Sequence, residues 1–464
     1  MIGLGCAKNL VDGEVMLGHL VERGVEVTPD LDDAEVVIVN TCGFIEDAKR
    51  ESVEAILEIA RRKGKGRLRR LVVAGCMAQG YAAELAAEVP EIDAFVGLDE
   101  LERVPEAVLG RLGRGHLPDQ HGAMKLYDHT APRLLATGGV YAYLKVAEGC
   151  DNPCTFCHIP RMRGSFRSRP LDSLVEEARR LEEAGVRELV LVAQDTTRYG
   201  EDLGMGRAGL RRLLEALLEG TGLPWIRFLY AYPATLDERI FPLMAREGRL
   251  APYLDIPLQH ASHRVLKLMK RGGGARTYRE LIAAARESVP GLAVRTTFIV
   301  GFPGEGEREF EELQRFVEDV RFDHVGVFAY SHQEENPGAT LGDPVPRRTK
   351  ERRRRLLMRQ QERISRAMNR VLRGTEMTAI VEGASPESEY LLQGRLLGQA
   401  PEVDGRLLFS DGTGRPGDIV RVKITKTYAF DLVGEIREVL IPAPSRHHAL
   451  LPSLPSLRAA AVGR

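Results

Sequence analysis

Cysteine is scarce in this sequence, with six residues among 464. So few cannot form a disulfide scaffold in a chain of this length, so they are better explained as ligands or nucleophiles in a reducing compartment. No apolar run approaches the roughly 20 residues that cross a bilayer, and no basic region followed by a hydrophobic stretch marks a secretory signal. The net charge of −1 provides no global field that would attract nucleic acid or a membrane. These absences predict a cytoplasmic globular protein without a membrane partner.

The length predicts about three domains, and the patterns divide the chain accordingly. In residues 1–112, β-branched runs alternate with helical stretches, as in a doubly wound α/β domain. Residues 113–135 lack periodicity and are interpreted as a linker. Residues 136–368 contain six β-like runs with helical patterns between them, then a long basic helix, which predicts a parallel sheet or an open (β/α)6 partial TIM barrel. Residues 371–440 have period-two runs typical of a small antiparallel, OB-like β-barrel, and 441–464 are expected to form a flexible tail.

The stretch "EGCDNPCTFCHIP" holds three of the cysteines, Cys150, Cys154 and Cys157, directly after a predicted strand. In barrel-like α/β folds this end of a strand carries the chemistry. Iron–sulfur cubanes ordinarily take four thiolates, so either a distant group completes the site or one iron stays open for a substrate or cofactor. The alternatives are a zinc site or incidental clustering. His158 is a poor fourth ligand because adjacent residues on a tight loop rarely converge on one metal, and we assign it no role.

The other three cysteines, Cys6, Cys42 and Cys76, each come directly after a β-like run. Carboxyl ends of parallel strands lie at the same edge of a sheet, where ligands collect. These thiols are therefore expected to meet in space, although buried cysteines also occur simply as small hydrophobes. Only five residues precede Cys6, so the alternatives are a short first strand or a protein start upstream of Met1.

Several motifs together resemble the radical S-adenosylmethionine methylthiotransferases. "GCDNPCTFCHIP" resembles the signature of radical S-adenosylmethionine enzymes, and "LDIPLQHAS", "RVLKLMKRG" and "TFIVGFPGE" resemble their core. "LGCAKNLVDGE" and "NTCGFIEDAKRESV" are similar to the amino-terminal methylthiotransferase domain, and the last barrel is similar to a TRAM domain. The resemblance covers residues 1 to 440. "GRLLGQAPEVDG" and "NTCGFIEDAK" resemble the RimO branch, which modifies ribosomal protein S-twelve, more than the branch that modifies transfer-RNA adenosine.

The resemblance implies two [4Fe–4S] clusters with an open iron each. The one on Cys150, Cys154 and Cys157 would bind S-adenosylmethionine and yield a 5′-deoxyadenosyl radical that abstracts hydrogen. The auxiliary one would supply sulfur and be held by Cys6, Cys42 and Cys76. The implied product is a 3-methylthioaspartate in ribosomal protein S-twelve, free or in the small subunit. An electron donor and a sulfur donor are required, and no catalytic side chain is implied beyond the clusters and S-adenosylmethionine.

Six polar residues at or near predicted strand ends could contact S-adenosylmethionine, and ordinary hydrogen bonding at the barrel rim is the alternative. They are Gln194, Asp195, Gln259, His260, Arg295 and Thr297.

Charge gives a further indication of the partner. Residues 373–438 contain eight Lys and Arg against eleven Asp and Glu, a net charge of −3, whereas a module that grips RNA should be basic. The basic run Arg352–Arg355 could suggest RNA, but such runs are more often the solvated face of a helix. RNA binding is therefore not favoured, and an acidic barrel suits a basic ribosomal protein. Two alternatives remain: the same chemistry on transfer-RNA adenosine, and a non-catalytic iron–sulfur or zinc protein that uses its barrel for binding.

Overall fold

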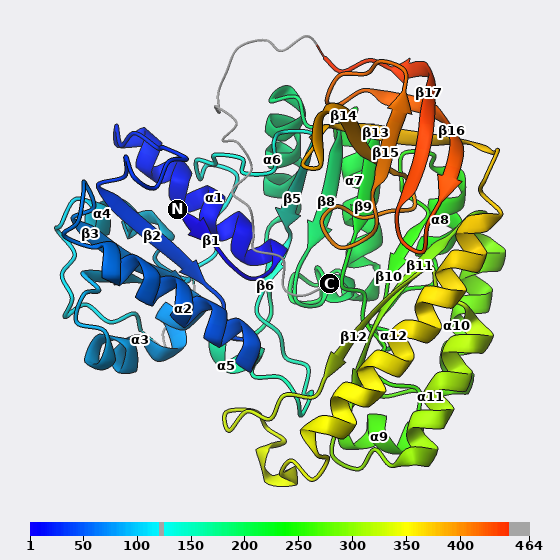
Figure 1. The fold of residues 1–464 in the computed structure, drawn as a ribbon, viewed down its shortest axis with the longest axis horizontal. Helices are drawn as coiled ribbons and strands as arrows, with labels where there is room; N and C mark the ends of the chain where they lie inside the picture. Colours follow the sequence, from blue (N-terminus) through cyan, green and yellow to red (C-terminus); the bar gives the residue numbers. More distant parts are fainter. Residues whose placement is uncertain (120–124, 445–464) are drawn as a thin grey trace.

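The computed structural model describes residues 1–119 and 125–444 and consists of three parts (Figure 1). An amino-terminal α/β domain lies beside a larger α/β core, and a small β-barrel sits on one end of that core. Most of the predicted tail, 441–464, lies outside the described residues, as does part of the predicted linker. Within the described residues, no helix is both long and apolar enough to cross a membrane.

The amino-terminal domain is a four-stranded parallel sheet with helices on both faces. The sheet runs in the order β1 (Ile2–Gly3), β2 (Val36–Thr41), β3 (Arg70–Gly75) and β4 (Ala94–Val96). The strands are buried on both faces and consist of Val, Ile, Leu and Ala, which is typical of a parallel sheet. Two helices cover one face, namely α2 (Glu46–Arg62) and α3 (Cys76–Glu88). The other face packs against α1 (Ala7–Glu22), a short η1 turn (Leu101–Arg103) and α4 (Val104–Val108).

The core is the predicted open barrel of six parallel strands. They are β5 (Tyr141–Lys145), β8 (Glu188–Val192), β9 (Trp225–Phe228), β10 (Tyr253–Asp255), β11 (Ala293–Val300) and β12 (His324–Ala329). A parallel bridge between Ile226 and Leu250 joins the two halves of this sheet. Two short strands, β6 (Ala147–Glu148) and β7 (Arg167–Ser168), pair beside the barrel.

Helices cover the outside of the core. The short α5 (Ile159–Arg163) instead packs against α3 of the amino-terminal domain. The helices on the outside are α6 (Leu171–Glu183), α7 (Gly209–Gly220), α8 (Ile240–Arg246), α9 (His263–Leu268), α10 (Ala275–Ser288), α11 (Glu307–Val320) and α12 (Arg347–Arg370). The last of these is the predicted basic helix. It is not simply a solvated face, because Lys350 and Arg353 are buried and pair with Asp343 and Glu305.

Burial alternates along β11. Val294, Thr296, Phe298 and Val300 are buried, whereas Arg295, Thr297 and Ile299 are half-buried. Since successive side chains of a strand point to opposite faces, the first set packs against the outer helices and the second faces the barrel interior. The interior core joins barrel residues such as Val190 and Tyr253 to Val11 of α1 and to Ala400 from the last domain. The barrel is thus filled partly by the two neighbouring domains.

The last domain is a closed five-stranded barrel. It contains β13 (Glu376–Ser385), β14 (Ser388–Leu396), β15 (Leu407–Asp411), β16 (Ile419–Thr427) and β17 (Leu432–Ile441). The strand order is β13-β14-β15-β17-β16. Neighbouring pairs are antiparallel, as predicted, except that β15 and β17 run parallel where the barrel closes.

The segment 397–406, between β14 and β15, enters the amino-terminal end of the core barrel. The hydroxyl of Tyr141 donates to Glu402 at 2.8 Å, and that of Tyr253 donates to Asp404 at 2.6 Å. This segment carries the "GQAPEVDG" motif, so two of its acidic side chains contact the core. Because Asp404 is fully buried and Glu402 is held by Tyr141, the net charge of −3 overstates how acidic the exposed barrel surface is.

Candidate active site: two sets of three cysteines

Cys150, Cys154 and Cys157, here called the radical set, lie on the loop between β6 and α5. Gly149 precedes the loop with φ of +76°, and a Cβ there would come within 2.0 Å of the Ser165 carbonyl oxygen. Only glycine tolerates both conditions. Two contacts of the main chain shape the loop: the Cys150 amide donates to the Gly164 oxygen, and the Cys157 amide donates to the Cys154 oxygen.

Cys6, Cys42 and Cys76, here called the auxiliary set, lie where the sequence places them. Cys6 precedes α1, Cys42 follows β2 directly, and Cys76 begins α3 directly after β3. Because β2 and β3 are adjacent and parallel, with Thr41 opposite Gly75, Cys42 and Cys76 leave the sheet side by side. A Cβ on Gly5 would lie 3.2 Å from the Cys42 sulfur, which shows how closely the Cys6 turn approaches that thiol.

The thiols of each set are close enough to influence one another electrostatically. Burial, followed by repulsion from Cys76 and Cys6, raises the pKa of Cys42 to about 12. Burial also raises the pKa of Cys157 to about 12, with Cys154 and Cys150 adding to the effect. All six cysteines are free. Two groups of crowded free thiols suit ligands of positively charged iron.

In the described part of the chain, no three His, Cys, Asp or Glu side chains converge at distances suited to a single metal ion. A cubane cluster binds each thiolate at a separate iron, so its ligands stand further apart than those of one ion.

Two side chains, one on the radical loop and one on α5, connect the two domains beside the cysteine sets. The first is His158, which is buried beside Cys157; its Nε2 lies 3.1 Å from the oxygen of Gly43, the residue after Cys42. Its other ring nitrogen lies 2.9 Å from the Asn336 side chain, and the ring stacks on Phe44. The sequence alone gave this residue no role. The structure shows it to be a contact between the two domains.

The second connection is Arg163, at the end of α5. Its Nη2 donates to the Cys76 sulfur at 3.3 Å, and the guanidinium also contacts Asp12 at 3.2 Å and Glu148 at 3.0 Å. Lys145 pairs with both carboxylates. Asp12, Lys145, Glu148 and Arg163 thus form a buried ring of alternating charge, here called the charge ring. It contacts the auxiliary set at Cys76 and, through Glu148, lies two residues from Cys150.

The predicted S-adenosylmethionine contacts fall into two groups. Gln194 and Asp195, at the carboxyl end of β8, hold the radical loop: Gln194 donates to Glu148 at 3.0 Å, and Asp195 accepts from Asn152 at 2.8 Å. Burial raises the pKa of Asp195. Gln259 has a left-handed backbone with φ of +69°. Its main-chain N–H donates to the main-chain oxygen of Thr297 at 2.8 Å.

The other two predicted contacts are engaged with protein carboxylates. His260 is fully buried, with Nε2 3.3 Å from Glu305. Arg295 lies 3.1 Å from Asp255 and 3.4 Å from Asp404 of the inserted segment. These ion pairs account for Arg295, whereas Nε2 of His260 is buried without a hydrogen-bond partner among the described residues.

Unpaired polar atoms indicate that the strand ends can accept a ligand. Among the described residues, the side-chain oxygens of Gln194 and Gln259 are buried without a hydrogen-bond partner. The same is true of the Nε of Arg271, whose Nη1 lies 3.6 Å from the Cys154 sulfur. Buried polar atoms are normally paired. Unpaired donors and acceptors beside the radical set therefore fit a polar cofactor bound there.

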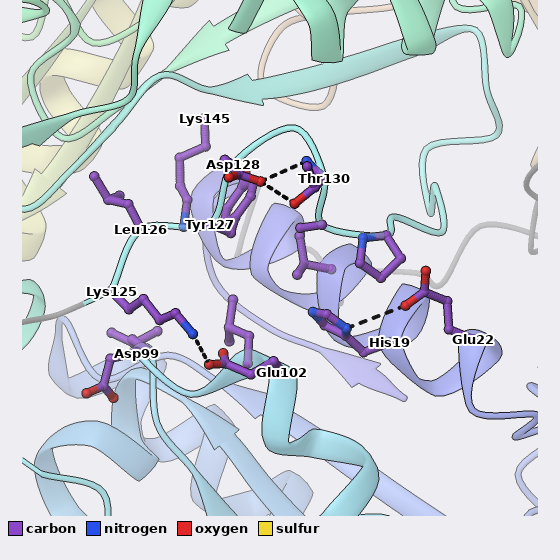
Figure 2. A pocket seen from close by; sticks show the side chains of 15 residues that line it. His19, Glu22, Asp99, Glu102, Lys125, Leu126, Tyr127, Asp128, Thr130 and Lys145 are labelled. Atoms are coloured by element: carbon purple, nitrogen blue, oxygen red, sulfur yellow. Dashed lines mark hydrogen bonds and ion pairs between the residues drawn. The ribbon is translucent and has the colours of Figure 1, made fainter. Parts of the chain in front are cut away.

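A cavity of about 320 Å³ lies beside α1, which contributes Val15, His19 and Glu22 to its lining (Figure 2). Figure 2 shows Lys125 reaching Glu102, and Asp128 holding Thr130, at its walls. Lys145 also lines this cavity, which therefore borders the charge ring.

Comparison with known proteins identifies all three parts of the chain. The radical SAM superfamily model matches residues 144–317, and the TRAM domain model matches 374–436. A family described as uncharacterized, UPF0004, matches 1–97. A solved radical S-adenosylmethionine methyltransferase, TsrM from Kitasatospora setae, shares the fold with a TM-score of 0.52 over 72% of both chains, at 16% identity. The chain is thus a radical SAM enzyme with a TRAM domain.

Curated relatives specify the family. The chain is 47% identical to "Ribosomal protein uS12 methylthiotransferase RimO" of Pelobacter propionicus, covering 94% of this chain and 97% of that protein. Proteins of the same name from Geotalea uraniireducens and Trichlorobacter lovleyi are 47% and 48% identical, over 97% and 98% of their lengths. The chain belongs to the RimO family of methylthiotransferases. The alternative of a non-catalytic metal-binding module does not agree with this membership.

Proposed function

We propose that this protein is a methylthiotransferase that converts an aspartate of ribosomal protein uS12 to 3-methylthioaspartate. The observation that carries the proposal is the similarity to proteins of that name over 94% of the chain, and the two sets of three free cysteines agree with it. In this proposal the radical set holds a [4Fe–4S] cluster that binds S-adenosylmethionine, and the auxiliary set holds a second one. When bound, the clusters and S-adenosylmethionine supply one-electron chemistry at an unactivated carbon and a site for sulfur, which side chains cannot provide.

The residues of the chain would position these groups. Gln194 and Asp195 hold the radical loop and, with Gln259 and Thr297, line the strand ends where S-adenosylmethionine would bind. His260 and Arg295 would contribute indirectly, by holding in place the carboxylates that they contact. Within the charge ring, Asp12 and Glu148 neutralise Lys145 and Arg163, and all four side chains are buried.

The substrate assignment is tested with reconstituted enzyme. After anaerobic loading with iron and sulfide, the protein is incubated with S-adenosylmethionine, a reductant, a sulfide source and purified uS12. We expect iron and sulfide contents of two clusters and a mass gain of one methylthio group on uS12. Cys150→Ala and Cys6→Ala should each lose about half of the iron, and Cys150→Ala should also stop 5′-deoxyadenosine formation.

Transfer RNA is the matched alternative substrate. Unmodified transfer RNA is incubated in parallel, and its nucleosides are analysed for a methylthio group. Modification of transfer RNA with none of uS12 would contradict the proposal. Zinc in place of iron, or a single cluster in wild type, would contradict the assignment of the two sets.

A further inference from the structure

Lys8 is a buried ammonium group beside the auxiliary set. It lies on the first turn of α1, two residues after Cys6, and is 7% exposed. Its Nζ lies 3.4 Å from the ring centre of Tyr230, which follows β9 at the carboxyl ends of the core strands. Lys8 therefore stands between the auxiliary set and the mouth of the barrel.

Lys8 differs from every other buried cation in the described part of the chain. The other two buried lysines, Lys145 and Lys350, each pair with a carboxylate. The buried arginines do so as well. No carboxylate of the described residues pairs with Lys8; its charged or ionisable neighbours are the Tyr230 ring, the Cys6 thiol and the Arg163 guanidinium.

This arrangement is energetically incomplete. Taking an ammonium group out of water costs more free energy than a desolvated cation–π contact returns. The neighbouring cation Arg295 is already neutralised by Asp255 and Asp404. A carboxylate that enters the barrel mouth would therefore meet, at Lys8, a buried ammonium group that has no carboxylate partner within the described part of the chain.

We propose that Lys8 binds the carboxylate of the side chain that is modified and so makes the enzyme specific for an acidic residue. The inference rests on the proposed function, because it takes the substrate side chain to be an aspartate. S-adenosylmethionine also carries a carboxylate, but its candidate contacts, Gln194 and Asp195, hold the loop of the radical set. Lys8 is joined in sequence to Cys6 of the other set. Its position thus favours the substrate carboxylate over that of the cofactor.

The test is a double-mutant cycle on binding. Reconstituted wild-type and Lys8→Met enzymes are titrated calorimetrically, without reductant, with uS12 and with uS12 whose reactive aspartate is changed to asparagine. We expect wild type to bind the aspartate form about tenfold or more tightly than the asparagine form, as for one desolvated charge pair. Lys8→Met should bind both forms equally. Lys8→Arg should keep a preference for aspartate, and Lys63→Met, which loses a pair with Asp93 elsewhere in the domain, should behave as wild type.

The outcomes separate the possible sources of the carboxylate. A preference for aspartate that persists in Lys8→Met, in protein with normal iron content and circular dichroism, overturns the inference. Weaker binding of S-adenosylmethionine by Lys8→Met, with the preference intact, would assign the contact to the cofactor and also overturns it. Either result alongside modification of uS12 by wild type leaves the proposed function standing. If wild type neither binds nor modifies uS12, the proposed function fails and this inference fails with it.

Discussion

Replacing Glu188 by glutamine tests how much one buried carboxylate, at the contact between the core and the TRAM domain, contributes to the stability of the fold. Glu188 begins β8 and is fully buried between Arg227 of β9 and Arg395 of β14. Glutamine keeps the size of the side chain and removes its charge. Arg395 retains a second carboxylate, Glu382 at 2.6 Å, but Arg227 has no other among the described residues. The substitution leaves a guanidinium group without a counter-ion where solvent does not reach it.

The expected loss follows from that geometry. Removing one partner of a buried ion pair costs about 3–5 kcal/mol, because the other charge stays desolvated. Arg227 keeps its contact with the Tyr253 ring at 5.0 Å and its hydrogen bond to the Leu397 oxygen at 3.0 Å. We therefore expect a loss of about 3 kcal/mol, at the lower end of the range. Since folded proteins are stable by only about 5–15 kcal/mol, this loss is large.

The chain contains its own reporter for this experiment. Trp225 is the only tryptophan and packs at the interface against Ile380 and Ile419 of the TRAM domain. Its fluorescence during urea unfolding measures the free energy lost in Glu188→Gln. The control is Glu318→Gln, which removes an exposed ion pair and should cost less than about 1 kcal/mol. If the two variants lose the same free energy at an unchanged denaturant slope, the reasoning is refuted.

Three further predictions concern the site and the interface. Gly149→Ala should lower the iron content by about half, because the added Cβ displaces the radical loop. Gly204→Ala is the control and should retain all iron, since Gly204 has a similar φ and lies in open space. Equal iron contents in the two variants would contradict this prediction. Arg163→Met should lower the reduction potential of the auxiliary cluster, because a positive charge and a hydrogen bond to the Cys76 sulfur are lost. The potential is measured by an electron paramagnetic resonance titration of protein that lacks the radical set, and Arg163→Lys should shift the potential less. An unchanged potential in Arg163→Met would count against the prediction. Burial alone would raise the pKa of Glu188, but its two arginines outweigh burial and lower it. The stability that Glu188 contributes is therefore complete above the unfolded pKa of about 4.3 and is lost as the pH falls toward the folded pKa. Urea titrations of Glu188→Gln should lack this acid-dependent loss. The same pH dependence in wild type and in Glu188→Gln would disprove the assignment.

The cysteine sets could be predicted from the sequence because each cysteine lies next to a strand that a short stretch of sequence reveals. Each auxiliary cysteine follows a strand, and parallel strands bring their carboxyl ends to one edge. The six core strands could be predicted for the same reason, since each is a short apolar run between helical patterns. The identity of the family also depended on short contiguous motifs.

The links between the sets could not be predicted, because they join residues far apart in the sequence. His158 meets the main chain of Gly43, and Arg163 meets Cys76, with no pattern at either position that marks the contact. Charge counting fails for a related reason, since it treats every ionised group as exposed. Arg353 in the basic run and Asp404 in the acidic barrel are both buried in ion pairs. Neither indicates a partner in solution.

The shared interior of the core barrel has a consequence for how the chain folds during synthesis. Val11 and Ala400 belong to one apolar cluster with residues from the barrel strands. The ribosome releases the first of these long before the second, and contacts of such large sequence separation form slowly. The apolar interior of the nascent core therefore stays partly unfilled until the segment 397–406 has left the ribosome. Truncation before Ala400 should accordingly yield aggregating protein rather than a smaller soluble enzyme.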